Sequence, residues 1–239
     1  IGIGGILLGN LIEGGHTSSL LQFTAGLIVL TGTLGAVMVS NPSRDLSLAF
    51  NLLKKAFKDD NAEKLNRSII EIVECTKIVK KESVLALEAQ YSRLNDPFFK
   101  KILRNVIDGI DPQIIREIFE AEISTEEESL LAGAKVWSDA GGYSPTIGII
   151  GAVLGLIHVM GNLTDTSKLG GGIAVAFVAT VYGVGLANLV YLPIASKIKK
   201  RIQSQIRDRQ VILEGALMVN SGLSATIVNQ KLRAYLGSE

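Results

Sequence analysis

Charged residues are absent from three long stretches of this 239-residue chain, and this pattern predicts its main structural elements. Residues 17–40, 140–164 and 169–196 contain no Asp, Glu, Lys or Arg. A transmembrane helix needs about 20 apolar residues to cross roughly 30 Å of hydrocarbon. Buried helices of soluble proteins that are this long usually keep a polar face. We therefore predict that these stretches are three membrane-spanning helices.

A fourth apolar segment opens the chain and runs from Ile1 to Ile12. It is too short to cross a bilayer by itself. Because the chain begins with Ile rather than Met, we interpret it as the second half of a first transmembrane helix. A signal peptide would show a basic start and a small-residue cleavage site, and neither is visible.

The polar segment between the second and third spans carries helix signals. Asp96-Pro97 and Asp111-Pro112 each match a capping residue followed by proline at the first helical position. Asp108-Gly109 indicates a break between two helices. Ser124 and Glu127 fit a capping box, but they also fit the interior of one long helix, and the sequence leaves both interpretations open.

Together these signals predict an all-α membrane protein with four transmembrane helices. Residues 1–40 contain the first two spans, and residues 41–139 form a large helical cytoplasmic domain. Residues 140–196 contain spans three and four, and residues 197–239 form a helical cytoplasmic tail.

The distribution of positive charge predicts the topology. Of the 24 Lys and Arg residues, 15 lie in the segment 41–139 and eight follow residue 196, so that only Lys168 lies elsewhere. Loops rich in Lys and Arg stay on the cytoplasmic side. We therefore expect both termini in the cytoplasm. The single cysteine, Cys75, also lies in the cytoplasmic segment, so we expect no disulfide.

Small residues recur at helical spacing on the third and fourth spans. They are Gly148, Gly151 and Gly155 on the third span, and Ala176, Thr180, Gly183 and Ala187 on the fourth. Small residues let helix backbones approach closely in lipid. Two interpretations stay open: the stripes pack spans three and four against each other, or they pack against the helix of a second subunit.

Each of these two spans also contains a proline near its predicted cytoplasmic end. Pro145 fits the start of the third span, and Pro193 fits a kink near the end of the fourth. Proline removes a backbone donor, which membranes tolerate where neighbours, water or a cavity satisfy the freed carbonyl.

The chemistry-bearing residues exclude most function classes. With two histidines and one cysteine, a His- or Cys-based metal site is not expected, and no enzyme motif is present, so we predict a non-enzyme without a cofactor. No complete span contains a carboxylate. The deepest polar groups of the spans are Thr146, His158, Thr180 and Tyr182. If this protein conducts ions, a partner must supply the ionisable group.

Several longer segments match one known family in order and spacing. They are GNLIEGG at 9–15, KKESVLALE at 80–88, PTIGIIGAVLGLI at 145–157, AVAFVATVYGVGLANLVYLPIASKI at 174–198 and EGALMVNSGLSATIVNQKLRAYL at 214–236. As a set they resemble the MotA/PomA family of flagellar stator subunits, over nearly the whole chain. The chain departs from the family pattern at Lys80, Lys81 and Ser83, where Arg-Arg and Gly are usual.

The resemblance implies an assembly in the bacterial inner membrane. Five such subunits surround a dimer of a MotB-type, peptidoglycan-binding partner, whose single transmembrane helix carries the missing aspartate. Spans three and four, with their small-residue stripes, would face the partner helices. Ion flow would turn the pentamer, and the pentamer would turn the rotor through its switch protein FliG. Lys80 and Glu88 fall on the charged pair that contacts the rotor, and their spacing would place them on nearly the same face of one helix.

The resemblance also implies an ion pathway and the transported ion. Thr180 falls where a threonine lines the path, and Pro145 and Pro193 fall on functionally sensitive prolines; Tyr182 is a further candidate. Sodium-type members pair this threonine with one on span three, where this chain has Ala152. Because a methyl group offers no oxygen ligand to a dehydrated cation, we predict proton rather than sodium coupling.

Two other functions stay open at this stage. One is an energiser of outer-membrane processes of the ExbB/TolQ type, which typically has three spans rather than four. The other is a membrane scaffold that conducts no ions, for which neither Thr180 nor the glycine stripe would be needed.

Overall fold

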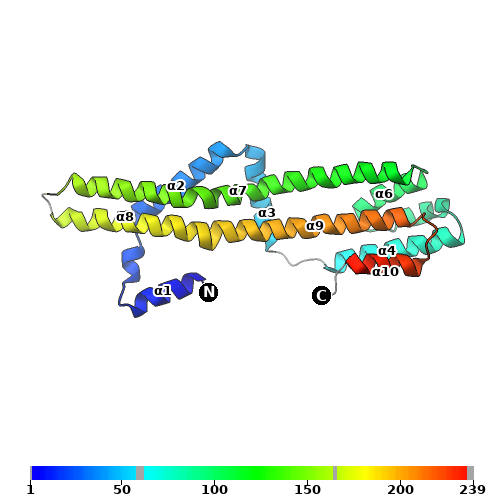
Figure 1. Cartoon of the computed structure of the whole chain (residues 1–239), viewed down its shortest axis with the longest axis horizontal. Coiled ribbons are helices and arrows are strands. Elements are labelled where there is room, and N and C mark those ends of the chain that lie inside the picture. Colours follow the sequence, from blue (N-terminus) through cyan, green and yellow to red (C-terminus); the bar gives the residue numbers. More distant parts are fainter. Residues whose placement is uncertain (1, 58–61, 164–165, 236–239) are drawn as a thin grey trace. The chain divides into compact units, whose positions relative to one another are not determined.

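The computed structural model of this chain describes residues 2–57, 62–163 and 166–235, and almost all of them lie in helices (Figure 1). No strand occurs in these three ranges. The all-α prediction is therefore confirmed. Lys168, the one basic residue outside the two predicted cytoplasmic segments, has its side chain outside the described part of the chain.

The N-terminal part consists of short and medium helices. Helix α1 covers Gly2–Ile12, the 3₁₀ turn η1 covers Thr17–Leu20, α2 covers Phe23–Ser40 and α3 covers Ser43–Ala56. Within the described residues, three helical segments are long and apolar enough to span a membrane, namely Thr17–Ser40, Pro112–Met160 and Leu169–Met218. Helix α1, with 11 residues, is a shorter apolar helix, so the fourth span stays a prediction.

The polar middle segment folds as the local signals predict. Helix α4 covers Ala62–Lys81, the 3₁₀ turn η2 Val84–Leu87, α5 Glu88–Tyr91 and α6 Pro97–Ile107. The Asp96 carboxylate accepts hydrogen bonds from the backbone N–H groups of Phe98 and Phe99, which confirms it as the cap of α6. Gly109 has a φ of 74°, a conformation that glycine adopts without strain, and it separates α6 from α7.

Helix α7 covers Pro112–Met160 and is 49 residues long. Asp111 caps it, because its Oδ1 accepts a hydrogen bond of 2.8 Å from the N–H of Gln113. Ser124 and Glu127 lie inside this helix, so of the two open interpretations the long helix is correct. Pro145 also lies inside it, so no helix begins at this proline, and its place at the start of the third span stays a prediction. Residues on both sides keep the helix continuous although proline donates no hydrogen bond.

The C-terminal part is one nearly continuous helix followed by a short one. Helix α8 covers Thr166–Leu186, a π-helical turn η3 covers Ala187–Tyr191, α9 covers Leu192–Met218 and α10 covers Ala225–Tyr235. Within η3 the N–H of Leu192 bonds to the carbonyl of Ala187, five residues back. The kink expected at Pro193 is therefore preceded by one widened turn.

The chain divides into two compact units, each with its own buried residues. Unit 1 comprises residues 1–57 and 130–200, and unit 2 comprises residues 58–129 and 201–239. In unit 1, α2 packs against α8 and α7, whereas in unit 2, α10 packs against α4. The predicted borders at residues 40, 139 and 196 concern the membrane rather than packing, and they stay predictions.

Candidate functional site

Helices α7 and α8 approach so closely in unit 1 that backbone touches backbone. A Cβ atom on Gly148 would lie 2.8 Å from the carbonyl oxygen of Ala179, and one on Gly183 would lie 2.6 Å from that of Ser144. The fully buried Ser144 donates its hydroxyl hydrogen to the carbonyl of Gly183 at 2.9 Å. No side chain larger than hydrogen fits at either glycine without a shift of the backbone.

The same contact continues along both helices. A Cβ atom on Gly155 would lie 2.8 Å from the carbonyl oxygen of Gly172 and 2.9 Å from the nitrogen of Ala176. At Gly151 it would lie 2.8 Å from the Cβ of Ala179. The glycine stripe thus packs spans three and four of one subunit against each other, which was one of the two open interpretations. Ala187, the last member of the α8 stripe, is also buried. Contact of these residues with a partner helix stays a prediction.

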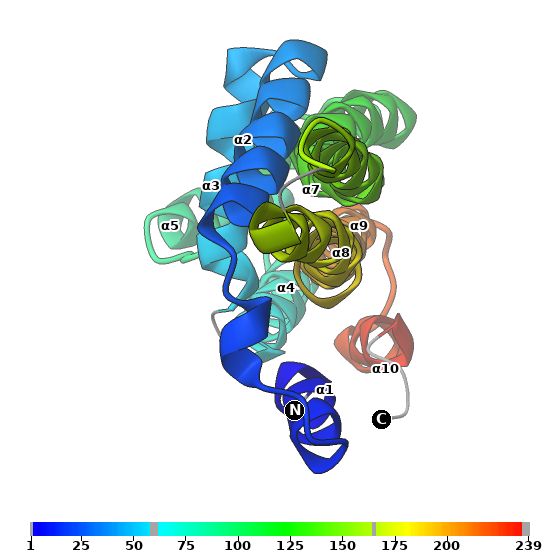
Figure 2. The same ribbon diagram turned by 90° about the vertical axis from the view of Figure 1, so that its left-hand side faces the viewer.

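Helix α2 covers one side of the α7–α8 pair, as the end-on view of Figure 2 shows. Ile28 of α2 lies against Gly151, and Gly32 of α2 lies against Ile147, so this edge of α7 faces α2. On α8, the buried Ala179 and Val178 pack with Ala25 and Val29 of α2. Span two is therefore packed on spans three and four from one side only.

Ala152 and Thr180 border the opposite side of this pair. Successive residues of an α-helix are turned by about 100°, so each of them lies next to a contact residue but away from α2. Both are half-buried. The hydroxyl group of Thr180 donates to the carbonyl of Ala176, four residues back, at 3.3 Å, and its oxygen lone pairs stay available. The structure thus places the predicted pathway threonine and the methyl group of Ala152 on a common side.

Exposed apolar side chains that were not among the predicted site residues extend this side of the helix pair. They are Ile149, Val153, Leu156 and Met160 on α7, and Ile173, Phe177, Val181 and Val184 on α8. Their spacing of three or four residues on each helix was readable from the sequence. Because both predicted spans are apolar all round, however, periodicity alone could not tell a lipid-facing side from a partner-facing one.

Tyr182 lies on the other side of α8, next to α2. Its hydroxyl group donates to the carbonyl of Leu20 and accepts from the N–H of Gln22 at 3.4 Å. Its ring packs on the cluster formed by α2 and α8. The structure therefore does not bring Tyr182 together with Thr180, and this contact supports a structural role rather than the predicted role in the ion path.

The remaining predicted residues of the spans are spread along their helices. Pro145 is half-buried and follows the contact residue Ser144, whereas Pro193 is exposed and follows η3. His158 is exposed. The exposed Thr146 donates its hydroxyl hydrogen to the carbonyl of Tyr143 at 2.8 Å.

Lys80 and Glu88 lie in unit 2 on different elements. Helix α4 ends at Lys81, Ser83 is extended, and Glu88 begins α5 after the turn η2. The expectation that both lie on the face of one helix was therefore wrong, because the extended residue interrupts the helical repeat. Both side chains are exposed, as a contact surface requires.

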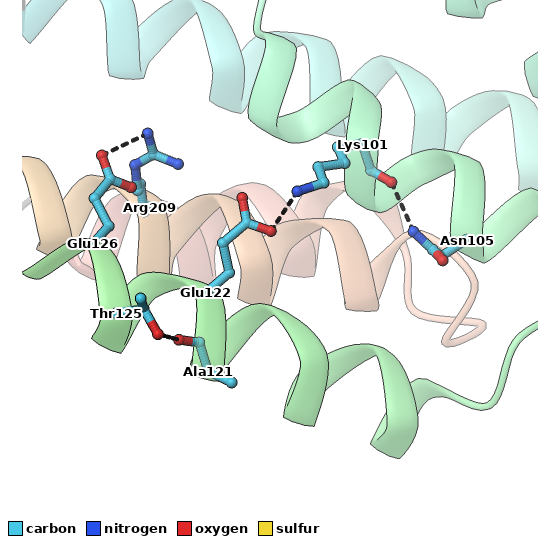
Figure 3. A network of polar contacts seen from close by, with 7 residues as sticks. All are labelled: Lys101, Asn105, Ala121, Glu122, Thr125, Glu126 and Arg209. Carbon is cyan, nitrogen blue, oxygen red and sulfur yellow. Dashed lines mark hydrogen bonds and ion pairs between the residues drawn. The ribbon is translucent and has the colours of Figure 1, made fainter.

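Ion pairs join the helices of unit 2 (Figure 3). Three of their residues, Lys101, Glu122 and Arg209, also line a cavity of about 550 Å³. Lys101 of α6 pairs with Glu122 of α7, and Arg209 of α9 donates to Glu126 of α7 at 2.9 Å. Nearby, Arg116 of α7 forms a two-pronged pair with Glu214 of α9, and this hydrogen bonding raises the pKa of the guanidinium group. In the described part of the chain, no group of three His, Cys, Asp or Glu side chains could hold a metal ion. These contacts are of the kind that brace helices.

Comparison with known proteins decides the family of this chain. The model of the MotA/TolQ/ExbB proton channel family matches residues 90–211. The chain belongs to this family. Motility protein A of Bacillus subtilis is 33% identical over 229 residues, which are 96% of this chain and 85% of that protein.

Two solved structures extend the similarity to the fold of the whole chain. MotAB of C. jejuni superimposes with a TM-score of 0.92 at 27% identity, covering 100% of this chain and 93% of the matched chain. The flagellar MotAB stator complex of Bacillus subtilis gives a TM-score of 0.86 at 33% identity, covering 98% and 94%. Sequence and fold therefore both indicate a multi-pass membrane protein of the proton channel family.

Proposed function

We propose that this chain is the channel-forming stator subunit of a bacterial flagellar motor, which couples inward proton flow to rotation. The single observation that carries the proposal is the composition of the side of the α7–α8 pair that faces away from α2. This side presents Thr180 within a broad apolar surface, and its described residues include no carboxylate. A channel built on such a surface needs an ionisable group from another chain.

The relatives favour a stator over the two other functions. They are a motility protein and subunits of MotAB complexes, one of which is a flagellar stator complex. We therefore infer a MotB-type partner whose transmembrane helix lies against the α7–α8 side and brings an aspartate beside Thr180. Five copies of this chain around two copies of the partner would enclose these helices. The same resemblance supports an inner-membrane location with both termini in the cytoplasm.

The decisive experiment is complementation of a stator-null strain with this chain and its genomic partner. We expect swimming to return, and we expect it to be lost when the partner's intramembrane aspartate is replaced by asparagine. Phe177→Asp should also abolish swimming, because it places a charge on the proposed partner-facing surface. The matched control is Phe177→Leu, which keeps this exposed surface apolar and should swim normally at the same protein level in the membrane. Normal swimming of the Phe177→Asp variant would overturn the assignment of this surface.

Proton coupling is the second part of the proposal, and it is supported by the half-buried Ala152, which lies on the same side of the helix pair as Thr180. One hydroxyl group provides too few oxygen ligands for a dehydrated sodium ion, whereas a proton needs only an acceptor and a wet route. We expect motor rotation to continue when external sodium is removed at fixed pH and ionic strength. Rotation that stops without sodium and returns with it would refute proton coupling without refuting the stator.

Contact with the rotor switch protein FliG is the third part, and it is supported by the exposure of Lys80 and Glu88. Charge pairs steer a weak contact between two surfaces. Lys80→Glu should lower swimming speed severalfold at unchanged expression and ion conductance, and a compensating charge reversal in the rotor protein should restore it. The control is Lys77→Glu, an exposed charge on the same helix, which should swim normally.

A further inference from the structure

The hydroxyl group of Thr33 in α2 is buried without a hydrogen-bond partner. The residue is 1% exposed, and its side-chain oxygen forms no hydrogen bond within the described ranges. A hydroxyl group buried in this way costs free energy unless it is hydrogen-bonded. Four other helical threonines donate to the carbonyl four residues back, namely Thr31, Thr76, Thr125 and Thr180. Thr33 leaves this bond to its own helix unmade, so its hydroxyl group is available to another element.

The level of Thr33 within unit 1 follows from its neighbours on α2. It lies midway between the buried Val29 and Val37 on one stripe of the helix. Leu186 of α8 packs on the cluster that contains Val29, and Tyr191 packs on the cluster that contains Val37. Thr33 lies between these two contacts, about one helical turn from each. It is therefore at the level of the widened turn η3, which begins directly after Leu186.

Two carbonyl groups of η3 lack their ordinary donors. In an α-helix each carbonyl accepts a hydrogen bond from the N–H group four residues further on. For Asn188 this donor is Leu192, whose N–H group bonds to the carbonyl one residue further back instead. For Leu189 it is Pro193, which has no N–H group. The turn lies inside the charge-free stretch 169–196, and hydrocarbon offers a carbonyl group no replacement.

We propose that a water molecule is bound inside unit 1 between Thr33 and the two freed carbonyl groups of η3. Water suits this set of groups, because it donates to two acceptors and accepts from one hydroxyl group. The acceptors are the carbonyl groups of Asn188 and Leu189, and the donor is Thr33. Ordered water of this kind satisfies interrupted helices in membranes. The bound water thus keeps η3 in its widened form. The inference is independent of the proposed stator function.

The first test detects the water itself. The full chain, with ¹³C in its threonines, is placed in lipid bilayers, and magnetisation is transferred from water protons to carbon by solid-state NMR. We expect rapid transfer to Thr33, and Thr33→Val assigns its signal by removing it. The matched control is Thr76, which is 2% exposed and whose hydroxyl group donates to the carbonyl of Ile72 at 2.9 Å. Transfer to Thr33 as slow as to Thr76 would overturn the proposal. A Thr33 signal that moves when sodium is replaced by potassium would also overturn it, because the ligand would then be a cation.

The second test asks whether this water joins α2 to η3. The ¹³C chemical shifts of the Asn188 and Leu189 carbonyl groups report their hydrogen bonding. In Thr33→Val we expect at least one of them to move towards the shift of an unbonded carbonyl group, because the water loses its donor. The matched control is Thr31→Val, an exposed position of the same helix whose hydroxyl group donates to Leu27, and it should leave both shifts in place. Unchanged shifts in Thr33→Val, or equal changes in the control, would show that no such bridge exists.

The third test is the sign of a change in stability. Valine has the shape of threonine without its hydroxyl group, so Thr33→Val removes the hydrogen bond and little else. We expect the melting temperature in detergent to fall by about 2–4 °C, because a satisfied buried group is lost. Thr31→Val should leave it unchanged. A rise in Thr33→Val would contradict the proposal, since the hydroxyl group would then have had no partner. A fall without water transfer to Thr33 would contradict it as well, because the hydroxyl group would then bond directly to the protein.

Discussion

The two ends of helix α7 are held to their neighbours by opposite means. In unit 1 it meets α8 through glycines and one buried serine, with atoms of the two backbones in contact. In unit 2 it meets α9 through the Arg116–Glu214 and Glu126–Arg209 pairs, and it buries large side chains such as Ile115 and Phe119. One continuous helix therefore uses two sets of contacts.

The difference follows from the solvent expected around each end. Lipid tails are as apolar as leucine, so burying a large side chain between helices gains little there, and close backbone approach stabilises the contact instead. In water, burial of apolar area gives roughly 25 cal/mol per Å², and large side chains are the better choice. The packing of α7 thus reports its surroundings independently of hydropathy.

The largest expected effect is at Gly183 of α8. Gly183→Leu should prevent α7 and α8 from packing, since even its Cβ atom would lie 2.6 Å from the carbonyl oxygen of Ser144. We expect the protein level in membranes and swimming both to be lost. The matched control is Gly185→Leu on the same helix, where a Cβ atom would meet nothing within 4 Å. Comparable loss of protein and swimming in both variants would show that α8 tolerates leucine at neither glycine. Close backbone contact would then not be what distinguishes unit 1 from unit 2.

An intermediate effect is expected at Arg116 of α7. Arg116→Met leaves Glu214 partly buried without its partner and should destabilise unit 2 by about 1 kcal/mol, because the pair is also partly exposed to water. Arg116→Met/Glu214→Met should recover most of this loss, since an apolar pair can replace an ion pair. Thermal unfolding in detergent measures both. A double variant less stable than the single one would show that the charges themselves hold α7 to α9.

The smallest expected change is at Cys75, in the core of unit 2. Its thiol pKa is raised to about 12, chiefly by burial, so at pH 8 the folded protein holds almost no thiolate. Iodoacetamide should therefore leave Cys75 unmodified until the protein unfolds, as mass spectrometry can detect. Because the folded pKa lies above the unfolded one, this thiol begins to oppose folding only above about pH 9. Cys75→Ala should accordingly flatten the alkaline fall in stability, and rapid alkylation at pH 8 would indicate a loosely packed core.

Several features of the fold followed from local sequence signals. Charge-free stretches located the three long apolar helices, and the Asp96 and Asp111 caps set the starts of α6 and α7. Such signals are reliable because each depends on a few neighbouring residues. The stretch around Ser124 shows their limit, because a capping box has no effect where packing keeps the helix continuous on both sides.

The arrangement of the candidate site depended on contacts that sequence spacing does not contain. Helical spacing grouped Gly148 with Gly155, but it could not determine whether they face the fourth span of the same subunit or the helix of a second subunit. It also placed Lys80 and Glu88 on one helix, because eight residues are about two helical turns. The glycine that is usual in the family at the position of the extended Ser83 was the one signal of a break. Tyr182 appeared among the polar groups of its span, yet only the loop before α2 determines the partner of its hydroxyl group.

The widened turn η3 brings the buried residues of α8 and α9 into line along one side. Ala187 and Ala195, both buried, are eight residues apart, and in an uninterrupted α-helix they would point about 80° apart. The fifth residue in the π turn takes up one position of the repeat, so that the two alanines come nearly into line and the buried Ile198 follows on the same stripe. In evolutionary terms, η3 has the form of a single-residue insertion that the helix absorbed without being broken. Deleting one residue between 188 and 191 would rotate the side chains of α9 about the helix axis by about a quarter of a circle relative to those of α8.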